Sequence, residues 1–465
     1  MKKFTFILVL ALGSSLLTPL AAQYVDLYNF VAPVGAEPFG TLTLAGGKLY
    51  GTAYLGGAND SGSIFSVDTN GANYKDLHDF AGPDGKQPNS PLTIIGGVLY
   101  GSANAGAAHD SGCIFAIDTD GTNYRDLYDF SGPDGKNPYN SLVQSGGVFF
   151  GIADGGAHNL GCIFKIDTDG TGYKKLLDFA GVSNGEYPLG IILVGTKLYG
   201  TTLIGGANSL GLAYSVDTTG LNFKDLLNFN SPSGYEPFGG LTYSNGMLFG
   251  ATAYGGTGSQ GILFSVDTSG NNPKRLYNFS GTDGAQPEYA GGSPTIIGGK
   301  YYGTTYFGGA HDSGVIFSID TNGSNYKDLY DFTGPDGANP EGSITVGGVF
   351  YGATALGGTN HVGVVYSFDT TKVLTAINKS SVGSGQLSVY PNPSKGEFKI
   401  ELRNVDGGMK NIQIYNELGQ NVYSQSNIQN STFTISLNQP NGVYLYRILT
   451  EKGALVCEGK IVVQR

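Results

Sequence analysis

The sequence contains no tryptophan, only three cysteines among 465 residues, and only 14% charged residues. Three cysteines are too few for a disulfide framework. The composition also lacks the high charge and the poverty in apolar residues that keep a chain disordered. After the N-terminus no segment is apolar over the ~20 residues that a membrane-spanning helix needs. We therefore expect a globular mature chain with no transmembrane segment, stabilised by core packing.

Residues 1–22 form a separate stretch with the pattern of a secretory signal peptide. Lys2 and Lys3 precede an apolar run, and two alanines end the stretch before Gln23. A membrane anchor is the weaker interpretation, because Gly13 and Pro19 interrupt the apolar run. The sequence thus predicts export, with residues 1–22 removed.

Glycine and tyrosine are abundant, with 76 and 30 copies, and they recur in a long repeat. A glycine that follows Leu-Tyr, Phe-Phe, Leu-Phe, Tyr-Tyr or Phe-Tyr marks each copy, at positions 51, 101, 151, 200, 250, 303 and 352. An aspartate and a phenylalanine recur with the same spacing. The three markers agree on seven copies of about 50 residues.

Each copy contains four short apolar runs separated by turn residues. In the second copy the runs are 91–95, 98–102, 113–118 and 124–130. Four strands in ~50 residues are typical of one propeller blade. The region opens with one isolated fourth strand, 24–30, and closes after only three strands. We therefore predict an all-β, seven-bladed propeller over 23–370, in which 24–30 completes the last blade. Two open β arrays are the alternative.

Cys113 and Cys162 occupy one position in successive copies, where other copies place residues such as Ile262 and Val315. The apolar residues at the equivalent positions predict that both cysteines are buried and unreactive, rather than forming a disulfide or a reactive thiol.

The repeated Asp-Thr-Asp-Gly phrase at 118–121 has carboxylates at alternate positions, as at the start of a calcium loop. Other copies place Thr219 or Ser269 at the third position, and no glutamate follows at the twelfth. Asp-Gly is also what a β-hairpin turn requires. Calcium therefore lacks a full motif, and we expect neither a metal site nor another cofactor. The Gly-Pro-Asp-Gly phrase is likewise interpreted as a turn between blades.

Histidines gather in the loop between the second and third strands of several copies, some beside a carboxylate that would suit metal binding or proton transfer. We favour the interpretation that these residues are polar loop tips, because the loops belong to different blades and other copies place Asn59 or Asn208 there. The sixth copy is also longer than its siblings, because it carries extra residues at 288–293. Insertions in repeat proteins often lie on the binding face, although a neutral insertion is equally compatible. The candidate ligand-binding residues are Tyr289, Glu288, His109, Asp110, His311, Asp312, Tyr254 and Tyr306.

Charge and motifs exclude several functions. Residues 23–387 carry 16 basic and 31 acidic side chains, a net charge of 16 − 31 = −15, which argues against nucleic acid as a partner. No phosphate-binding loop, nucleophile elbow or zinc spacing occurs. Carboxylates are numerous, so an acid–base pair acting on polysaccharide stays open, but no catalytic residue is singled out.

After a Ser/Gly-rich linker, 371–387, residues 388–465 change to alternating strand patterns, which predict a small Ig-like β-sandwich. Its motifs resemble the type A C-terminal sorting domain of the type IX secretion system. The resemblance implies type IX secretion machinery as a partner, export, and later removal of the domain. The motif residues are Pro391, Asn392, Pro393, Gly419, Gly442 and Tyr444.

The repeats themselves are similar to the ~50-residue tandem repeats called GloVer, through the Gly-Gly to Ile-Asp core seen at 46–68. That family implies no activity. We expect a secreted or cell-surface binding module for a glycan, a protein or an envelope component. The alternatives are an extracellular polysaccharide hydrolase or lyase, with carboxylates at the propeller mouth, and a structural surface protein without a specific ligand.

Overall fold

The computed structural model describes residues 24–32, 34–287, 294–370, 387–402, 410–415, 421–428, 432–450 and 455–464. The chain divides into two compact units, residues 1–371 and 372–465. The expected signal peptide lies outside the described residues, and so does the expected linker except for its last residue. Among the described residues, no helix is long and apolar enough to cross a membrane.

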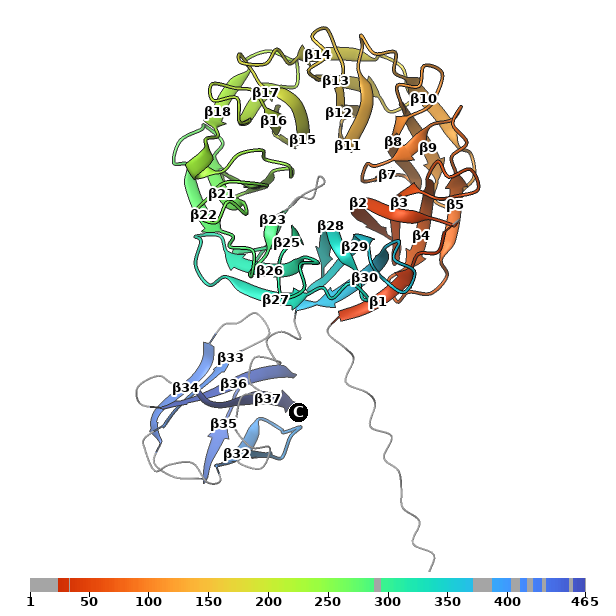
Figure 1. Cartoon of the computed structure of the whole chain (residues 1–465). Helices are drawn as coiled ribbons and strands as arrows, with labels where there is room; N and C mark the ends of the chain where they lie inside the picture. Colours follow the sequence, from red (N-terminus) through yellow and green to blue (C-terminus); the bar gives the residue numbers. More distant parts are fainter. Residues whose placement is uncertain are drawn as a thin grey trace, which may run out of the picture. The chain divides into compact units, whose positions relative to one another are not determined.

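Seven antiparallel sheets form a ring in the first unit, which confirms the seven-bladed propeller (Figure 1). Blades 1 to 3 consist of β2 (Ala36–Ala45), β3 (Lys48–Leu55), β4 (Ser63–Asp68) and β5 (Lys75–Asp79); β6 (Lys86–Pro88), β7 (Thr93–Ile95), β8 (Val98–Ala105), β9 (Cys113–Asp118) and β10 (Arg125–Asp129); β11 (Lys136–Ser145), β12 (Val148–Asp154), β13 (Cys162–Asp167) and β14 (Lys174–Asp178). Blades 4 and 5 consist of β15 (Glu186–Val194), β16 (Lys197–Ile204), β17 (Leu212–Asp217) and β18 (Lys224–Asn228); β19 (Thr242–Ser244), β20 (Met247–Thr252), β21 (Ile262–Asp267) and β22 (Lys274–Asn278), with the short helix η1 (Ser231–Ser233) between them. Blades 6 and 7 consist of β23 (Ala285–Pro287), β24 (Thr295–Ile297), β25 (Lys300–Phe307), β26 (Val315–Asp320) and β27 (Lys327–Asp331); β28 (Ala338–Val346), β29 (Val349–Leu356), β30 (Val364–Asp369) and β1 (Tyr24–Asn29).

The last blade is completed by the first strand, as the sequence predicts. β1 pairs antiparallel with β30, with Tyr24 opposite Phe368 and Asn29 opposite Val364. The outer edge of the last three-stranded sheet is thereby covered. Because an uncovered strand edge invites pairing with another chain, this closure protects the ring.

The inner strand differs from expectation in blade 2, where it is split into β6 and β7 instead of running through 91–95. Pro91 lies at the break, and proline has no N–H to contribute to a ladder. β11, at the same place in blade 3, has Ser141 instead and is assigned as one strand.

The glycine that marks each copy makes room for an aromatic ring from the neighbouring strand. Gly101 of β8 lies opposite Phe115 of β9. A Cβ on Gly101 would lie 2.6 Å from Phe115 Cζ and 2.8 Å from Leu92 Cδ2. Phe115 is fully buried there, so the repeated glycine is a requirement of core packing.

The repeated phrase around residues 124–135 forms the joint between two blades. The Tyr128 ring of blade 2 stacks on Tyr173 of blade 3, with centroids 4.1 Å apart and planes 7° apart. The Tyr128 hydroxyl donates to Asp134 Oδ2, and the Tyr173 hydroxyl donates to the Asp134 carbonyl. Asp134 Oδ1 accepts the Ser131 N–H at 2.8 Å. Asp134 thus closes the Gly-Pro-Asp-Gly turn, which confirms the turn interpretation. Similar ring stacks join Tyr28 to Tyr74, His78 to Tyr124, Tyr277 to Tyr326 and Tyr330 to Tyr24.

The ring has two unlike faces. On the loop face, exemplified in blade 2 by residues 106–112 and the turn 81–85, the Ala107 N–H donates to the Gly82 carbonyl at 2.8 Å. On the hairpin face, exemplified by residues 96–97 and 118–123, the Thr119 N–H donates to the Gly97 carbonyl at 2.9 Å. β1 begins and β30 ends on the hairpin face, because Thr370 N–H bonds the Gly348 carbonyl of that face.

The second unit consists of two sheets among its described residues. One contains β31 (Leu387–Tyr390), β32 (Glu397–Leu402) and β35 (Thr432–Ser436); the other contains β34 (Asn421–Ile428), β33 (Lys410–Tyr415), β36 (Gly442–Thr450) and β37 (Leu455–Val463). Buried residues such as Phe398, Ile412 and Ile448 form one core. These small sheets agree with the predicted sandwich.

Cys113 and Cys162 are free and fully buried, which confirms their expected role as small core residues. Burial is the main cause that raises the pKa of the Cys162 thiol, to about 12. A thiol with such a pKa is a poor nucleophile.

Candidate functional site

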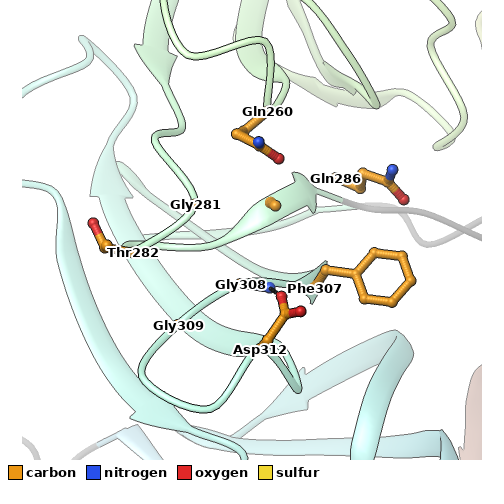
Figure 2. Close-up of a pocket in the computed structure, with 9 residues that line it drawn as sticks. Gln260, Gly281, Thr282, Gln286, Phe307, Gly308, Gly309 and Asp312 are labelled. Atoms are coloured by element: carbon orange, nitrogen blue, oxygen red, sulfur yellow. Dashed lines mark hydrogen bonds between the residues drawn. The ribbon is translucent and has the colours of Figure 1, made fainter.

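A pocket of about 480 Å³ opens on the loop face between blades 5 and 6 (Figure 2). Its lining comes from the loop between β20 and β21 of blade 5, the turn into blade 6, the start of β23, and the end of β25 with the loop that follows it. We call it the rim pocket. It is lined by Gln260, Gly281, Thr282, Ala285, Gln286, Phe307, Gly308, Gly309 and Asp312.

A small residue follows the last glycine of the turn into blade 6, as it does in blades 1 and 7, which have Ala36 and Ala338 there. In blades 2 and 3 that position holds Lys86 and Lys136, whose side chains lie over the glycine at the start of the next loop. In blade 5 it holds Tyr235, whose ring stacks on Tyr254 at 5.5 Å. In blade 6 it holds Ala285, which is too short to cover this space.

The lining combines an apolar ring with the polar side chains of Gln260, Thr282, Gln286 and Asp312. Phe307 is 38% exposed, and Figure 2 shows its side chain near those of Gln286 and Asp312. The backbones of Gln260 and Gln286 are tied together by a 2.9 Å hydrogen bond. Within the described part of the chain, no hydrogen bond engages either glutamine side-chain amide. Two amides are therefore free to bind a ligand beside an exposed aromatic ring.

Asp110 and Asp312 each close the loop in which they lie. Asp110 Oδ1 accepts the Gly106 N–H at 3.1 Å, and Asp312 Oδ1 accepts the Gly308 N–H at 2.9 Å. Both residues have positive φ angles, 51° and 54°, a region that aspartate tolerates better than most residues. Asp110 also bonds Lys86 Nζ at 3.2 Å. Hydrogen bonds from Lys86 and from the Gly106 N–H hold the pKa of Asp110 below its usual range. Only Asp312 of the two lines the rim pocket.

The candidate histidines belong to blades that are not neighbours in the ring. His109 lies in the loop of blade 2 and His311 in that of blade 6, and both are exposed. The backbone carbonyl of each accepts a 3.2 Å hydrogen bond from a nearby serine hydroxyl. Another histidine, His78, bonds Asp84 Oδ2 at 2.9 Å and replaces the tyrosine of the blade joint. Its position marks it as part of the joint.

Of the candidate aromatic and insertion residues, Tyr254 stacks on Tyr235 in blade 5, and Tyr306 contacts Phe307 edge to face at 4.8 Å. Tyr306 directly precedes the pocket residue Phe307 in β25. Glu288 and Tyr289 lie outside the described residues. Gln286, on the rim pocket, is only two residues before them in sequence.

No group of three or more histidine, cysteine or acidic side chains suited to a metal ion occurs among the residues that the structure describes. The aspartates of the repeated hairpin have other partners. Asp118 Oδ2 accepts a 2.7 Å hydrogen bond from Asn123, and Asp120 Oδ1 accepts the Thr122 N–H at 2.9 Å. These contacts fit a hairpin turn.

Close aspartate pairs occur on the outer strands of blades 1, 2 and 6. Burial and the neighbouring Asp79 raise the pKa of Asp76 to about 7, and burial with Asp129 raises the pKa of Asp126 to about 7. Burial with Asp331 raises the pKa of Asp328 to about 6. None of these carboxylates lines the rim pocket.

In the second unit, the sorting motif residues hold the end of the chain. Asn392 Oδ1 accepts the Val462 N–H at 2.8 Å, and the Ser394 N–H donates to the Val462 carbonyl at 2.8 Å. The Tyr444 hydroxyl donates to the Pro440 carbonyl. The two prolines flanking Asn392, Pro391 and Pro393, are described, and Gly442 opens β36, whereas Gly419 lies outside the described residues.

Sequence reasoning did not select Gln260, Thr282 or Gln286, which come from two blades. The available signal was Gln260, which stands where other copies have serine, leucine or valine, whereas Ala285 has the same identity as Ala36 and Ala338 in blades 1 and 7. It becomes informative only when the turn, the strand and the loop are known to be neighbours.

Two family models match the chain. The Gloeobacter/Verrucomicrobia repeat matches residues 16–194, 153–293 and 193–392. The secretion system C-terminal sorting domain matches residues 388–464. Both agree with the resemblances found in the sequence. No protein of curated function matches the chain in sequence.

Solved structures with a similar fold are distant in sequence. A puromycin-hydrolyzing peptidase of Mycobacterium tuberculosis has 12% identity and a TM-score of 0.51, covering 80% of this chain and 59% of that chain. PorZ, a surface component of the type IX secretion system of Porphyromonas gingivalis, has 13% identity and a TM-score of 0.48, covering 92% and 60%. The propeller domain of the Trilobed protease of Pyrococcus furiosus has 12% identity and a TM-score of 0.42, covering 72% and 94%. At 12% identity, the likeness to the peptidase shows the fold alone.

Proposed function

The chain belongs to the Gloeobacter/Verrucomicrobia repeat family and ends in a secretion sorting domain, and from these premises we propose that it is an exported module that binds a glycan at the rim pocket. The sorting domain implies secretion to the cell surface or outside the cell. In the proposal, 1–22 is removed as a signal peptide, 23–370 is the binding propeller, and 388–465 directs export and is then removed.

The exposed Phe307 ring in one pocket with two unengaged amides is the observation that carries the proposal. A sugar ring has an apolar face of C–H groups, which packs on an aromatic ring, and hydroxyl groups that need donors and acceptors at its edge. Gln260 and Gln286 supply both. At about 480 Å³ the pocket lies within the range of small-ligand sites.

The position of the chain ends in the propeller supports surface display. β1 begins and β30 ends on the hairpin face, whereas the rim pocket opens on the loop face. If the propeller is attached through the chain that follows Thr370, the attachment point lies on the hairpin face and the rim pocket lies on the opposite, loop face.

The test is a glycan-array screen of the purified protein, with product analysis on every hit. Ala285→Lys copies the residue of blades 2 and 3 and should cover the pocket, so binding should fall more than tenfold. Ala338→Lys places the same residue at the equivalent position of blade 7 and is the matched control. A glycan that binds both variants equally would remove the rim pocket from the proposal.

The other two functions predict different results. A polysaccharide hydrolase or lyase would release shortened oligosaccharides from the hits, and single carboxylate substitutions would abolish turnover. A structural protein without a ligand would bind no glycan in either form.

A further inference from the structure

A second pocket, of about 170 Å³, lies among the inner strands of blades 1 to 5. Figure 1 shows these strands, among them β2, β11 and β15, bordering the centre of the ring. Most of its residues directly follow the proline shared by the inner strands. We call it the axial pocket. It is lined by Phe39, Asn89, Pro91, Tyr139, Asn140, Leu189 and Phe238.

Three aromatic rings and no charged side chain line the axial pocket. Two of its polar side chains are already engaged. The Tyr139 hydroxyl lies 2.5 Å from the Pro188 carbonyl oxygen. Asn140 donates to the Leu189 carbonyl and accepts the Ser141 N–H at 2.7 Å. Neither residue therefore offers its principal polar group to a ligand.

Asn89 is different. Its Oδ1 atom is buried and accepts no hydrogen bond within the described part of the chain. A buried acceptor without a donor is costly, by roughly 1–3 kcal/mol, and a ligand that brings one donor would remove that cost. Asn89 lines the axial pocket, so apolar rings and a residue with an unused buried acceptor lie together there.

The size of the pocket limits the ligand. A dry apolar cavity of about 150 Å³ holds one benzene ring, and the axial pocket measures about 170 Å³. A pyranose has several hydroxyl groups, more than one free acceptor satisfies. We propose that the axial pocket binds a single aromatic group, monocyclic or indole-sized, which packs against Phe39, Tyr139 and Phe238 and donates one N–H or O–H to Asn89 Oδ1.

The neighbouring blade supports an uncharged ligand. Glu341 of β28 follows the shared proline of blade 7, as Phe39 does in blade 1, and it is only 1% exposed. Both of its carboxyl oxygens lack a hydrogen-bond partner in the described residues. Burial first, and the charge of Glu37 second, raise the pKa of Glu341 well above its usual range. Glu341 does not line the axial pocket, and the lining itself contains no charged residue that would favour a cation.

The absence of tryptophan makes the test direct, because indole fluorescence excited beyond tyrosine absorption reports only on an added probe. Indole and N-methylindole are titrated into the full chain, since they differ in the N–H donor. In Asn89→Leu the preference for indole over N-methylindole should fall about tenfold relative to the wild type, which is the worth of one hydrogen bond. Leu189→Phe, which fills the pocket, should weaken both probes more than tenfold.

Gln286→Ala is the control, because Gln286 lines the rim pocket and not the axial pocket, and it should leave indole binding unchanged. The test of the axial pocket is therefore independent of the glycan proposal. N-acetyltryptophanamide is the third probe. If it binds as indole does, the ligand is an aromatic side chain of a peptide; if indole alone binds, the ligand is a free small aromatic. No binding of any probe, or binding that ignores both Asn89→Leu and Leu189→Phe, overturns the inference.

Discussion

Tyr24 stacks face to face on Tyr330, with ring centroids 4.3 Å apart and planes 1° apart. The two residues belong to opposite ends of the repeat region, and the Tyr24 hydroxyl also donates to the Asp336 carbonyl. This contact has the form of the other blade joints, so the first strand closes the ring with the same chemistry that joins neighbouring blades.

Tyr24→Ala should therefore lower the free energy of unfolding of the propeller by about 2 kcal/mol, because a packed ring and a hydrogen bond are lost. Urea denaturation measures the change. Val25→Ala, whose side chain is 39% exposed in the same strand, is the control and should change stability by less than about 0.5 kcal/mol. Equal effects of the two substitutions would mean that the joint does not stabilise the closure.

Gly101→Ala should destabilise the protein by about 2 kcal/mol, because the new Cβ would overlap the Phe115 ring at 2.6 Å. Phe115→Leu removes the ring tip and creates space. The double variant should lose clearly less stability than the sum of the two single variants, because the methyl group that Gly101→Ala adds occupies space that the Phe115 ring has left. Strict additivity in chemical denaturation would show that the glycine has another role.

The aspartate pairs predict a pH dependence of stability. The pKa of Asp126 is raised to about 7 in the folded state and is about 3.9 in an unfolded chain. The folded state therefore binds the proton more tightly, and this carboxyl lowers stability as pH rises from about 4 to about 7. Asp126→Asn removes the charge, so its melting temperature relative to the wild type should be higher at about pH 8 than at about pH 5.

Asp225→Asn is the matched control for that experiment, because the residue facing Asp225 is the neutral Asn228. Its melting temperature relative to the wild type should differ little between the two pH values. If Asp126→Asn shows no more pH dependence than this control, the like-charged pair does not govern stability.

Asn392→Ala should reduce export. It removes the acceptor of the Val462 N–H, which costs about 1 kcal/mol in a small domain, and so loosens the last strand of the sorting domain. The measurement is the fraction of protein outside the cell. Glu397→Ala, an exposed change in the same domain, should leave export unchanged; equal loss in both variants would contradict a specific role for the Asn392 contact.

The local pattern predicted the blades well because each blade is built from neighbouring residues. The turn at Asp134 and the glycine at 101 carry the same meaning in every copy, so repetition made them recognisable. The rim pocket was harder to predict. Its members Gln260 and Gln286 belong to different blades, and although Gln260 stands where other copies have serine, leucine or valine, that difference does not by itself indicate a pocket.

The sequence by itself determined the number of blades, the closure by residues 24–29 and the sorting domain, because periodic strands, turn residues and ordered motifs are properties of nearby positions. The tertiary structure alone decided which side chains meet. Ala285 lines the rim pocket together with Asp312 of the loop beside it, and Asn89 lines the axial pocket together with Phe39, Tyr139 and Phe238 of three other blades. Such contacts depend on the curvature of the whole ring, which no single repeat encodes.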